Sequence, residues 1–242
     1  FHDIYSLRPQ KLQIGFLKLL KGSGIRRDYT SQYAYDPQGP YEVLATQWLS
    51  YDKVAYLKVF EDVFERLYNS GKFMYTLNYL DRAYTADFFL LYEQLTDQWI
   101  AEGNDRLAIS DEQVSRFLWR FIQRTCKPSA QDLLSKLLCL DILTFFRFRQ
   151  KPDFLDWPEA DRVQTDPLWR NEEWLRQYFP DYAFTNWRDI KMRFRIFTVP
   201  ADLKDELSRY MAVPAGAAYL IGEKTRDGVT WNMIREPEHD EI

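Results

Sequence analysis

The sequence has few of the residues from which metal and redox sites are built. It contains two cysteines, Cys126 and Cys139, and two histidines, His2 and His239. The cysteines lack the Cys-x2-Cys spacing of zinc and iron–sulfur sites, and the histidines stand at opposite ends of the chain. We therefore expect no metal ligands here, and we interpret both cysteines as buried thiols on helices in a reducing cytoplasm.

Signatures of common enzyme classes are missing as well. The sequence has no Gly-x-Ser-x-Gly motif and no interior histidine that could serve as a base for a nucleophile. Its 9 glycines are few for a doubly wound nucleotide-binding fold. The formal net charge of -4 argues against a protein that tracks nucleic-acid phosphates, although a local basic patch stays compatible with it. We assign no catalytic residue.

Long hydrophobic runs are also absent. The longest apolar stretch, residues 133–146, is interrupted by Ser, Lys, Asp and Thr, which excludes a membrane span of about 20 apolar residues. The opening residues do not resemble a signal peptide, and we expect a cytoplasmic protein. Asp141 lies within the stretch, where we favour an acid on the wet side of an amphipathic helix over a buried, partnered acid.

Hydrophobic residues make up 46% of the chain and aromatic residues 17%, which is ample for a packed core. Apolar residues at helical spacing predict five successive helices, and short connections predict that neighbours pack antiparallel. Ser110 and Gln113 have the spacing of a capping box at the fourth helix. The five helices are expected at 51–68, 73–84, 85–103, from Ser110 onward and from Ser129 to about residue 150.

The pattern changes after residue 150 to a small α+β segment. Between 153 and 182 we expect only one short helix, near 172–178. A strand is predicted at 192–197 and a helix at 202–210. Two further strands, 217–223 and 229–234, flank Arg226-Asp227-Gly228, which indicates an antiparallel hairpin.

The first residues have a different character. Residues 1–7 are typical of the end of an amphipathic helix whose beginning is missing, so we expect the chain to be a piece of a larger protein. Residues 11–20 alternate and then become continuously apolar, which predicts a buried strand. Lys21, Gly22 and Ser23 follow this strand, at the position where α/β folds place ligands. They either contact an anion or another ligand, or they are an ordinary loop at the end of a strand. Residues 26–47 should be irregular, with a turn at 36–40.

One segment interleaves cations and aromatics. Arg188, Lys191, Arg193 and Arg195 could hold phosphates beside stacked bases. The alternative is a strand whose arginines are solvated or paired with acids, and we favour it because the chain as a whole is acidic.

Residues 7–23 (LRPQKLQIGFLKLLKGS), 40–52 (PYEVLATQWLSYD) and 68–73 (YNSGKF) resemble the end of the barrel, and the segment after it, in cobalamin-binding-domain radical SAM proteins. The resemblance implies a mainly α C-terminal domain behind a cobalamin-binding domain and a barrel that carries a 4Fe-4S cluster and S-adenosylmethionine. The Cys-x3-Cys-x2-Cys cluster motif of that family is absent from this sequence. In the intact parent, Lys21, Gly22 and Ser23 would approach cofactor or substrate.

These observations predict three parts: 1–47, the end of the barrel with a linker; 48–150, a helical bundle-like domain; and 151–242, a small α+β tail packed on it. We expect an accessory domain of an Fe-S oxidoreductase or methyltransferase, which covers the barrel or recruits substrate and is not catalytic alone. Its partners would be the barrel and the cobalamin-binding domain in cis. The alternatives are a tRNA-binding appendage and a protein-interaction module.

Overall fold

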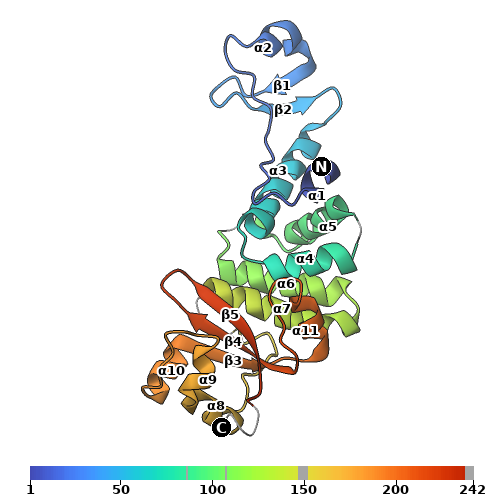
Figure 1. The fold of residues 1–242 in the computed structure, drawn as a ribbon. Coiled ribbons are helices and arrows are strands. Elements are labelled where there is room, and N and C mark those ends of the chain that lie inside the picture. Colours follow the sequence, from blue (N-terminus) through green and yellow to red (C-terminus); the bar gives the residue numbers. More distant parts are fainter. Residues whose placement is uncertain (86, 107, 147–151, 238–242) are drawn as a thin grey trace. The chain divides into compact units, whose positions relative to one another are not determined.

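The computed structural model describes residues 1–85, 87–106, 108–146 and 152–237. The chain divides into two compact units, residues 1–121 and 122–242, which are described one at a time (Figure 1). The division lies inside helix α6 (Asp111–Thr125). The described residues are mainly helical, with a small antiparallel sheet near the C-terminus, so the predicted fold class is confirmed.

The first unit begins with short elements. Helix α1 (His2–Ser6) is followed, after an extended segment, by α2 (Gly24–Tyr29) and the 3-10 turn η1 (Thr30–Gln32). Strands β1 (Tyr33–Tyr35) and β2 (Val43–Thr46) then pair antiparallel. The prediction that 26–47 is irregular was therefore wrong, although the turn at 36–40 is present, with the Gln38 amide donating to Asp36 Oδ1 at 2.8 Å.

The strand predicted at 11–20 is largely absent. Lys18 forms one isolated antiparallel bridge with Glu42, and the remaining residues of the segment have no regular secondary structure. A continuously apolar strand needs cover on both faces. Here Leu19 is fully buried, but Leu17 and Leu20 are 44% and 54% exposed. The apolar run therefore has one short partner, β2, and no covering layer among the described residues.

The helical body of the first unit agrees with the prediction. It contains α3 (Tyr51–Phe64), which continues into the π-helical turn η2 (Glu65–Asn69), then α4 (Met74–Ala83), α5 (Phe88–Ala101) and the 3-10 turn η3 (Asn104–Arg106). Ser50 and Asp87 cap α3 and α5, because their side chains accept from the amides of Lys53 and Leu90. Both caps satisfy amides that a helix start leaves without an internal partner.

The predicted capping box is confirmed at the start of α6. The Ser110 amide donates to Gln113 Oε1 at 2.8 Å, and the Gln113 amide donates to Ser110 Oγ at 3.3 Å. Helix α7 (Pro128–Phe146) follows in the second unit. Asp141 is only 3% exposed there, so the wet-side interpretation was wrong. Every residue from 137 to 143 is buried, and this part of α7 has no wet side.

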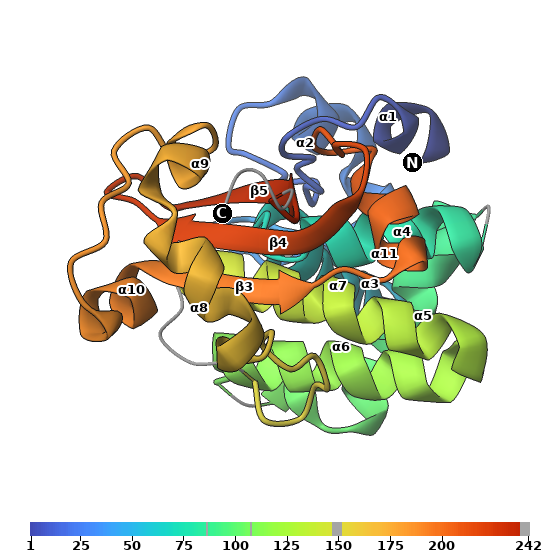
Figure 2. The same ribbon diagram turned by 60° about the horizontal axis from the view of Figure 1, so that its bottom comes forward.

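The second unit is built on a three-stranded antiparallel sheet of order β3-β4-β5 (Figure 2). Its strands are β3 (Phe194–Thr198), β4 (Ala217–Lys224) and β5 (Val229–Arg235). The Thr225 amide donates to the Gly228 carbonyl at 2.8 Å, which confirms the predicted hairpin turn. Helix α11 (Ala201–Leu207), also predicted, packs on α7, and Trp231 Nε1 of β5 donates to Thr144 Oγ1 at 2.9 Å.

Three helices precede or adjoin the sheet: α8 (Arg162–Arg170), α9 (Glu172–Arg176) and α10 (Trp187–Arg193). Only α9 was predicted. Pro167 lies inside α8 and made that segment resemble a loop. Helix α10 takes up the first two residues of the predicted strand, because the Asn186 side chain accepts from the Asp189 amide and starts a helix.

The predicted three-part division stays a prediction. Its boundary at 150 and 151 lies outside the described residues, and its boundary at 47 and 48 falls between β2 and α3. None of the helices in the described ranges is long and apolar enough to cross a membrane.

Candidate functional site

The residues predicted to approach a cofactor form the turn before α2. Gly22 has φ +82°, a conformation that side chains with a Cβ rarely adopt. The Ser23 hydroxyl donates to the Leu20 carbonyl at 2.9 Å, and the same oxygen accepts from the Arg26 amide at 3.3 Å. Lys21 lies over the ring of Tyr41, with its Nζ 5.5 Å from the centroid. The structure thus brings Lys21, Gly22 and Ser23 together at a surface turn.

A second cation reinforces this turn. The Arg26 guanidinium lies 5.1 Å from the ring centroid of Tyr35 and 5.3 Å from that of Tyr41, and it donates to the Leu19 carbonyl at 3.3 Å. Lys21 and Arg26 therefore share one aromatic ring, and cation–π contacts of this kind hold charge at a surface. A contact between this turn and a cofactor stays a prediction.

The most strongly coupled polar groups of the first unit lie deeper. The Tyr5 hydroxyl donates to Asp81 Oδ2 at 2.6 Å, and both residues are almost fully buried. Arg8 forms an ion pair with the same oxygen and donates to Tyr5 Oη at 3.3 Å. The Tyr92 hydroxyl is 3.5 Å from that of Tyr5. Tyr5 and Arg8 come from the N-terminal segment, so Asp81 fastens that segment to α4.

Burial governs the electrostatics of this cluster. It raises the pKa of Asp81, although the hydrogen bonds from Tyr5 and Arg8 act in the opposite direction. Asp81 Oδ1 is buried and accepts no hydrogen bond within the described residues, which is consistent with a high cost of charging the group. Burial, and then the Asp81 charge, raises the pKa of Tyr5 far above its usual value. Both phenols stay protonated at neutral pH, because burial also raises the pKa of Tyr92.

Aromatic rings enclose the cluster. Tyr5 contacts the rings of Tyr68, Phe88 and Phe64 at centroid distances of 5.0, 4.8 and 6.2 Å. Arg8 lies over Tyr5 and Phe88 at 4.9 Å from each centroid, and it has φ +51°. A non-glycine residue holds this left-handed conformation only where its surroundings fix it. The arrangement anchors the N-terminal segment to α4.

A further contact joins the chain before α2 to the π-helical turn η2. Asn69 accepts from the Leu12 amide at 2.9 Å and donates to the Leu12 carbonyl at 3.0 Å. One side chain therefore satisfies both backbone polar groups of Leu12, as a neighbouring strand would.

The four residues of the nucleic-acid interpretation are divided between two elements. Arg188, Lys191 and Arg193 lie on α10 and Arg195 lies on β3, so the strand predicted at 192–197 begins at Phe194 and contains only Arg195 of the four. Arg193 forms an ion pair with Glu223 across the sheet, and Arg195 pairs with Glu159 at 3.3 Å. The favoured alternative, arginines paired with acids, is correct for these two, whereas Arg188 and Lys191 are exposed.

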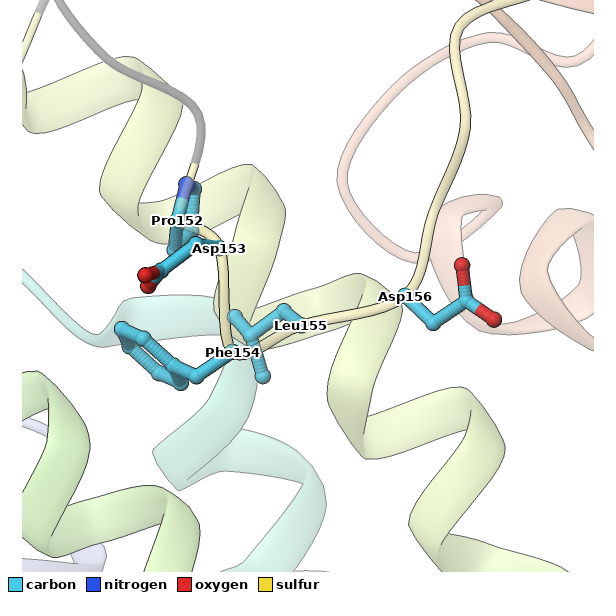
Figure 3. Close-up of a pocket in the computed structure, with 5 residues that line it drawn as sticks. All are labelled: Pro152, Asp153, Phe154, Leu155 and Asp156. Atoms are coloured by element: carbon cyan, nitrogen blue, oxygen red, sulfur yellow. The ribbon is translucent and has the colours of Figure 1, made fainter.

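Two shallow pockets lie in the second unit. One, of about 390 Å³, is lined by residues 152–156, and Figure 3 shows its two carboxylates, Asp153 and Asp156, pointing to opposite sides of the chain. They cannot act as the paired acids that hydrolysis of a glycoside requires. The other, of about 340 Å³, contains the Arg193–Glu223 ion pair with Lys224 and Arg226.

Metal and thiol chemistry have little support in the described ranges. No group of three His, Cys, Asp or Glu side chains converges there. Cys139 is buried and Cys126 half-buried, and burial raises the pKa of the Cys126 thiol. His2 pairs with Asp87 at 2.9 Å, and His239 lies outside the described residues.

Comparison with known proteins identifies a family. The model of the family described as "Protein of unknown function (DUF4080)" matches residues 29–213, which is more than half of the chain. The chain belongs to the DUF4080 family. The match extends over both units, from the end of α2 to just beyond α11, and leaves out Lys21, Gly22 and Ser23. No curated protein and no solved structure matched this DUF4080 chain.

Sequence reasoning missed the cluster around Asp81. A usable signal was present, since Asp81 follows Leu77 by four residues and Leu80 by one, on the face of α4 that carries apolar residues. An acid at a core-facing helical position requires a partner, which predicts a buried ion pair for Asp81. The sequence does not show that Arg8, the first arginine of the chain, is this partner.

Proposed function

We propose that this chain is an accessory domain of a radical SAM, cobalamin-dependent Fe-S oxidoreductase or methyltransferase. It would cover the barrel of that protein or recruit its substrate, and it would not be catalytic alone. The 4Fe-4S cluster, S-adenosylmethionine and cobalamin would be held by the barrel and the cobalamin-binding domain in cis. Residues 7–23, 40–52 and 68–73 support the proposal through their resemblance to that family.

One observation carries the proposal further. Large exposed hydrophobic side chains are concentrated in the first 51 residues, where Leu7 is 79% exposed, Trp48 68% and Leu20 54%. A high density of exposed large apolar side chains in one part of a chain is compatible with an interaction site. Full burial of each such side chain under a partner domain would contribute about 1.5 to 3 kcal/mol. The other members of this group are Phe1, Ile4, Leu17, Leu49 and Tyr51.

The direction of the chain fits the same arrangement. The N-terminal segment that would come from the barrel is fastened to α4 by the Asp81 cluster and to η2 by Asn69. A barrel joined to α1 would lie directly beside Ile4 and Leu7. The turn at Lys21, Gly22 and Ser23 would then approach the cofactor or substrate from the side of this domain.

A binding experiment tests the proposal. The 242-residue chain is mixed with the barrel polypeptide that the proposal places upstream of it, and association is measured by calorimetry. We expect Leu20→Asp and Trp48→Asp each to weaken association at least tenfold, because a charge would be buried in the interface. Val163→Asp is the matched control, since Val163 is 82% exposed but lies in the second unit.

Two results would overturn the proposal. One is an upstream reading frame without a Cys-x3-Cys-x2-Cys motif. The other is catalysis by the isolated chain: if it assembles a stable cluster from iron and sulfide and cleaves S-adenosylmethionine, it is not an accessory domain.

A further inference from the structure

A cluster of arginines and aromatic rings lies on the surface of the second unit, between α8 and α10. The Arg162 guanidinium lies 4.5 Å from the ring centroid of Trp187, at the start of α10. Arg170, at the end of α8, lies 5.7 Å from the same ring and 5.2 Å from that of Phe184. The two rings meet edge to face at 5.1 Å. We call these four residues the Arg–aromatic cluster; its helices are labelled in Figure 2.

Several cations of this surface are available to a ligand. Arg162 is paired with Asp166 at 3.4 Å. Arg170, Arg188 and Lys191 are exposed and form no ion pair with the described residues. Arg188 and Lys191 are three residues apart on α10, so their side chains share one face of that helix. The acid between them, Asp189, accepts hydrogen bonds from the Thr185 hydroxyl and from the Asn186 side-chain Nδ2 at the helix start.

The loop that carries Phe184 is fixed in place. The Phe184 amide donates to Glu172 Oε1 at 2.9 Å, and Glu172 is also paired with Arg176 at 2.6 Å. Arg176 in turn donates to the Tyr182 carbonyl at 2.9 Å. The rings are therefore held in position before any ligand binds, which reduces the entropy lost on binding.

We propose that the Arg–aromatic cluster, with Arg188 and Lys191, binds single-stranded nucleic acid. Bases would stack on the outer planes of the Arg162 and Arg170 guanidinium groups, which lie over the Trp187 ring, as bases do on arginine planes. Arg188 and Lys191 would contact phosphates along α10. The combination of stacking planes with unpaired cations favours a nucleic acid over an acidic peptide, which offers carboxylates but no bases.

The site differs from the sequence-based interpretation in its residues. Arg193 and Arg195 form ion pairs with Glu223 and Glu159, so they are not part of the proposed site. Arg162 and Arg170 are part of the proposed site, because α8 places them over the Trp187 ring. The proposal is independent of the radical SAM proposal, which concerns the first unit.

Fluorescence anisotropy of a labelled oligouridylate of about 12 nucleotides, a length within the range of single-strand sites, tests the proposal with the whole chain. We expect Trp187→Leu to weaken binding about 5- to 150-fold, the effect of one lost stacking plane, because the ring supports the guanidinium groups on which bases would stack. Arg188→Ala/Lys191→Ala should weaken binding and reduce the slope of log K against log salt by about 1.4.

Lys11→Ala/Lys53→Ala is the matched control, because it removes two exposed cations from the first unit. It should leave binding unchanged. An unchanged circular dichroism spectrum shows that Trp187→Leu is folded; if it is not, Arg170→Ala takes its place. The proposal fails if the wild-type chain does not bind at low salt or if the control weakens binding equally. It also fails if an abasic oligonucleotide or polyglutamate binds as tightly, because recognition would then need only negative charge.

Discussion

The hydrogen bond between Tyr5 and Asp81 should be a main contributor to the stability of the first unit. Tyr5→Phe removes one hydroxyl and leaves the ring among Tyr68 and Phe88. The lost bond is short, at 2.6 Å, fully buried and made to an acid. Hydrogen bonds to charged groups contribute about 1.5 to 3 kcal/mol, so we expect a loss of about 2 kcal/mol in the free energy of unfolding.

Hydrogen exchange followed by mass spectrometry measures this loss where it arises. Peptides from α4 and α5 report the opening free energy of the region around Asp81. Tyr56→Phe is the matched control: its hydroxyl donates to the exposed Asp97 at 3.0 Å, so the same chemical change should cost less than about 1 kcal/mol.

A double-mutant cycle isolates the bond itself. Tyr5→Phe and Asp81→Asn should each destabilise, and the double variant should lose about 1 to 2 kcal/mol less than their sum, because the two residues share one contact. If the effects simply add, or if Tyr5→Phe costs no more than Tyr56→Phe, the cluster does not stabilise the segment as we argue.

The remaining predictions concern pH, a helix cap and a turn. Because burial raises the pKa of Asp81 above its ordinary value of 3.8, its stabilising contribution is complete below pH 3.8 and is lost as the pH rises through the folded-state pKa. The unfolding free energy of the wild type minus that of Asp81→Asn should therefore fall as the pH rises. A difference that rises with pH would contradict this reasoning. Ser110→Ala should cost about 1 kcal/mol in urea unfolding, as should Gln113→Ala, since each removes half of the capping box. Gly71→Ala should cost about 1 to 2 kcal/mol through its φ of +67°, although no atom would meet the added Cβ within 4 Å. Gly15→Ala, with no atom within 4 Å and no such φ, should be close to neutral when both glycine variants are compared by urea unfolding.

Local signals predicted most of the helices. The capping box at Ser110 and Gln113 formed as its spacing indicated, because its partners lie within one helical turn. The hairpin around Gly228 formed for the same reason. Such elements depend on neighbours in sequence, and reasoning from sequence reaches them.

The failures involve partners distant in sequence. Residues 11–20 have the composition of a buried strand, but among the described residues their one bridge to another strand segment is that of Lys18 with Glu42, next to β2. Asp141 looked like a surface acid because nothing nearby in sequence shows that α7 is buried on every side between residues 137 and 143. Asp81 and Arg8 are 73 residues apart, and the ion pair between them follows from the fold rather than from any motif.

The π-helical turn η2 gives the chain an uneven tolerance to changes of length. Its widened ring holds one residue more than a regular turn and directs Asn69 toward Leu12. Deletion of one residue between 65 and 69 would restore an ordinary helix, but it would remove the widened turn that places Asn69 against Leu12. Asn69 would then face away from Leu12, while the helix itself would be more regular. A variant shortened by this residue should thus gain local helical order and lose the hydrogen bonds from Asn69 to the N-terminal segment. Relatives that keep this contact should therefore also keep the extra residue.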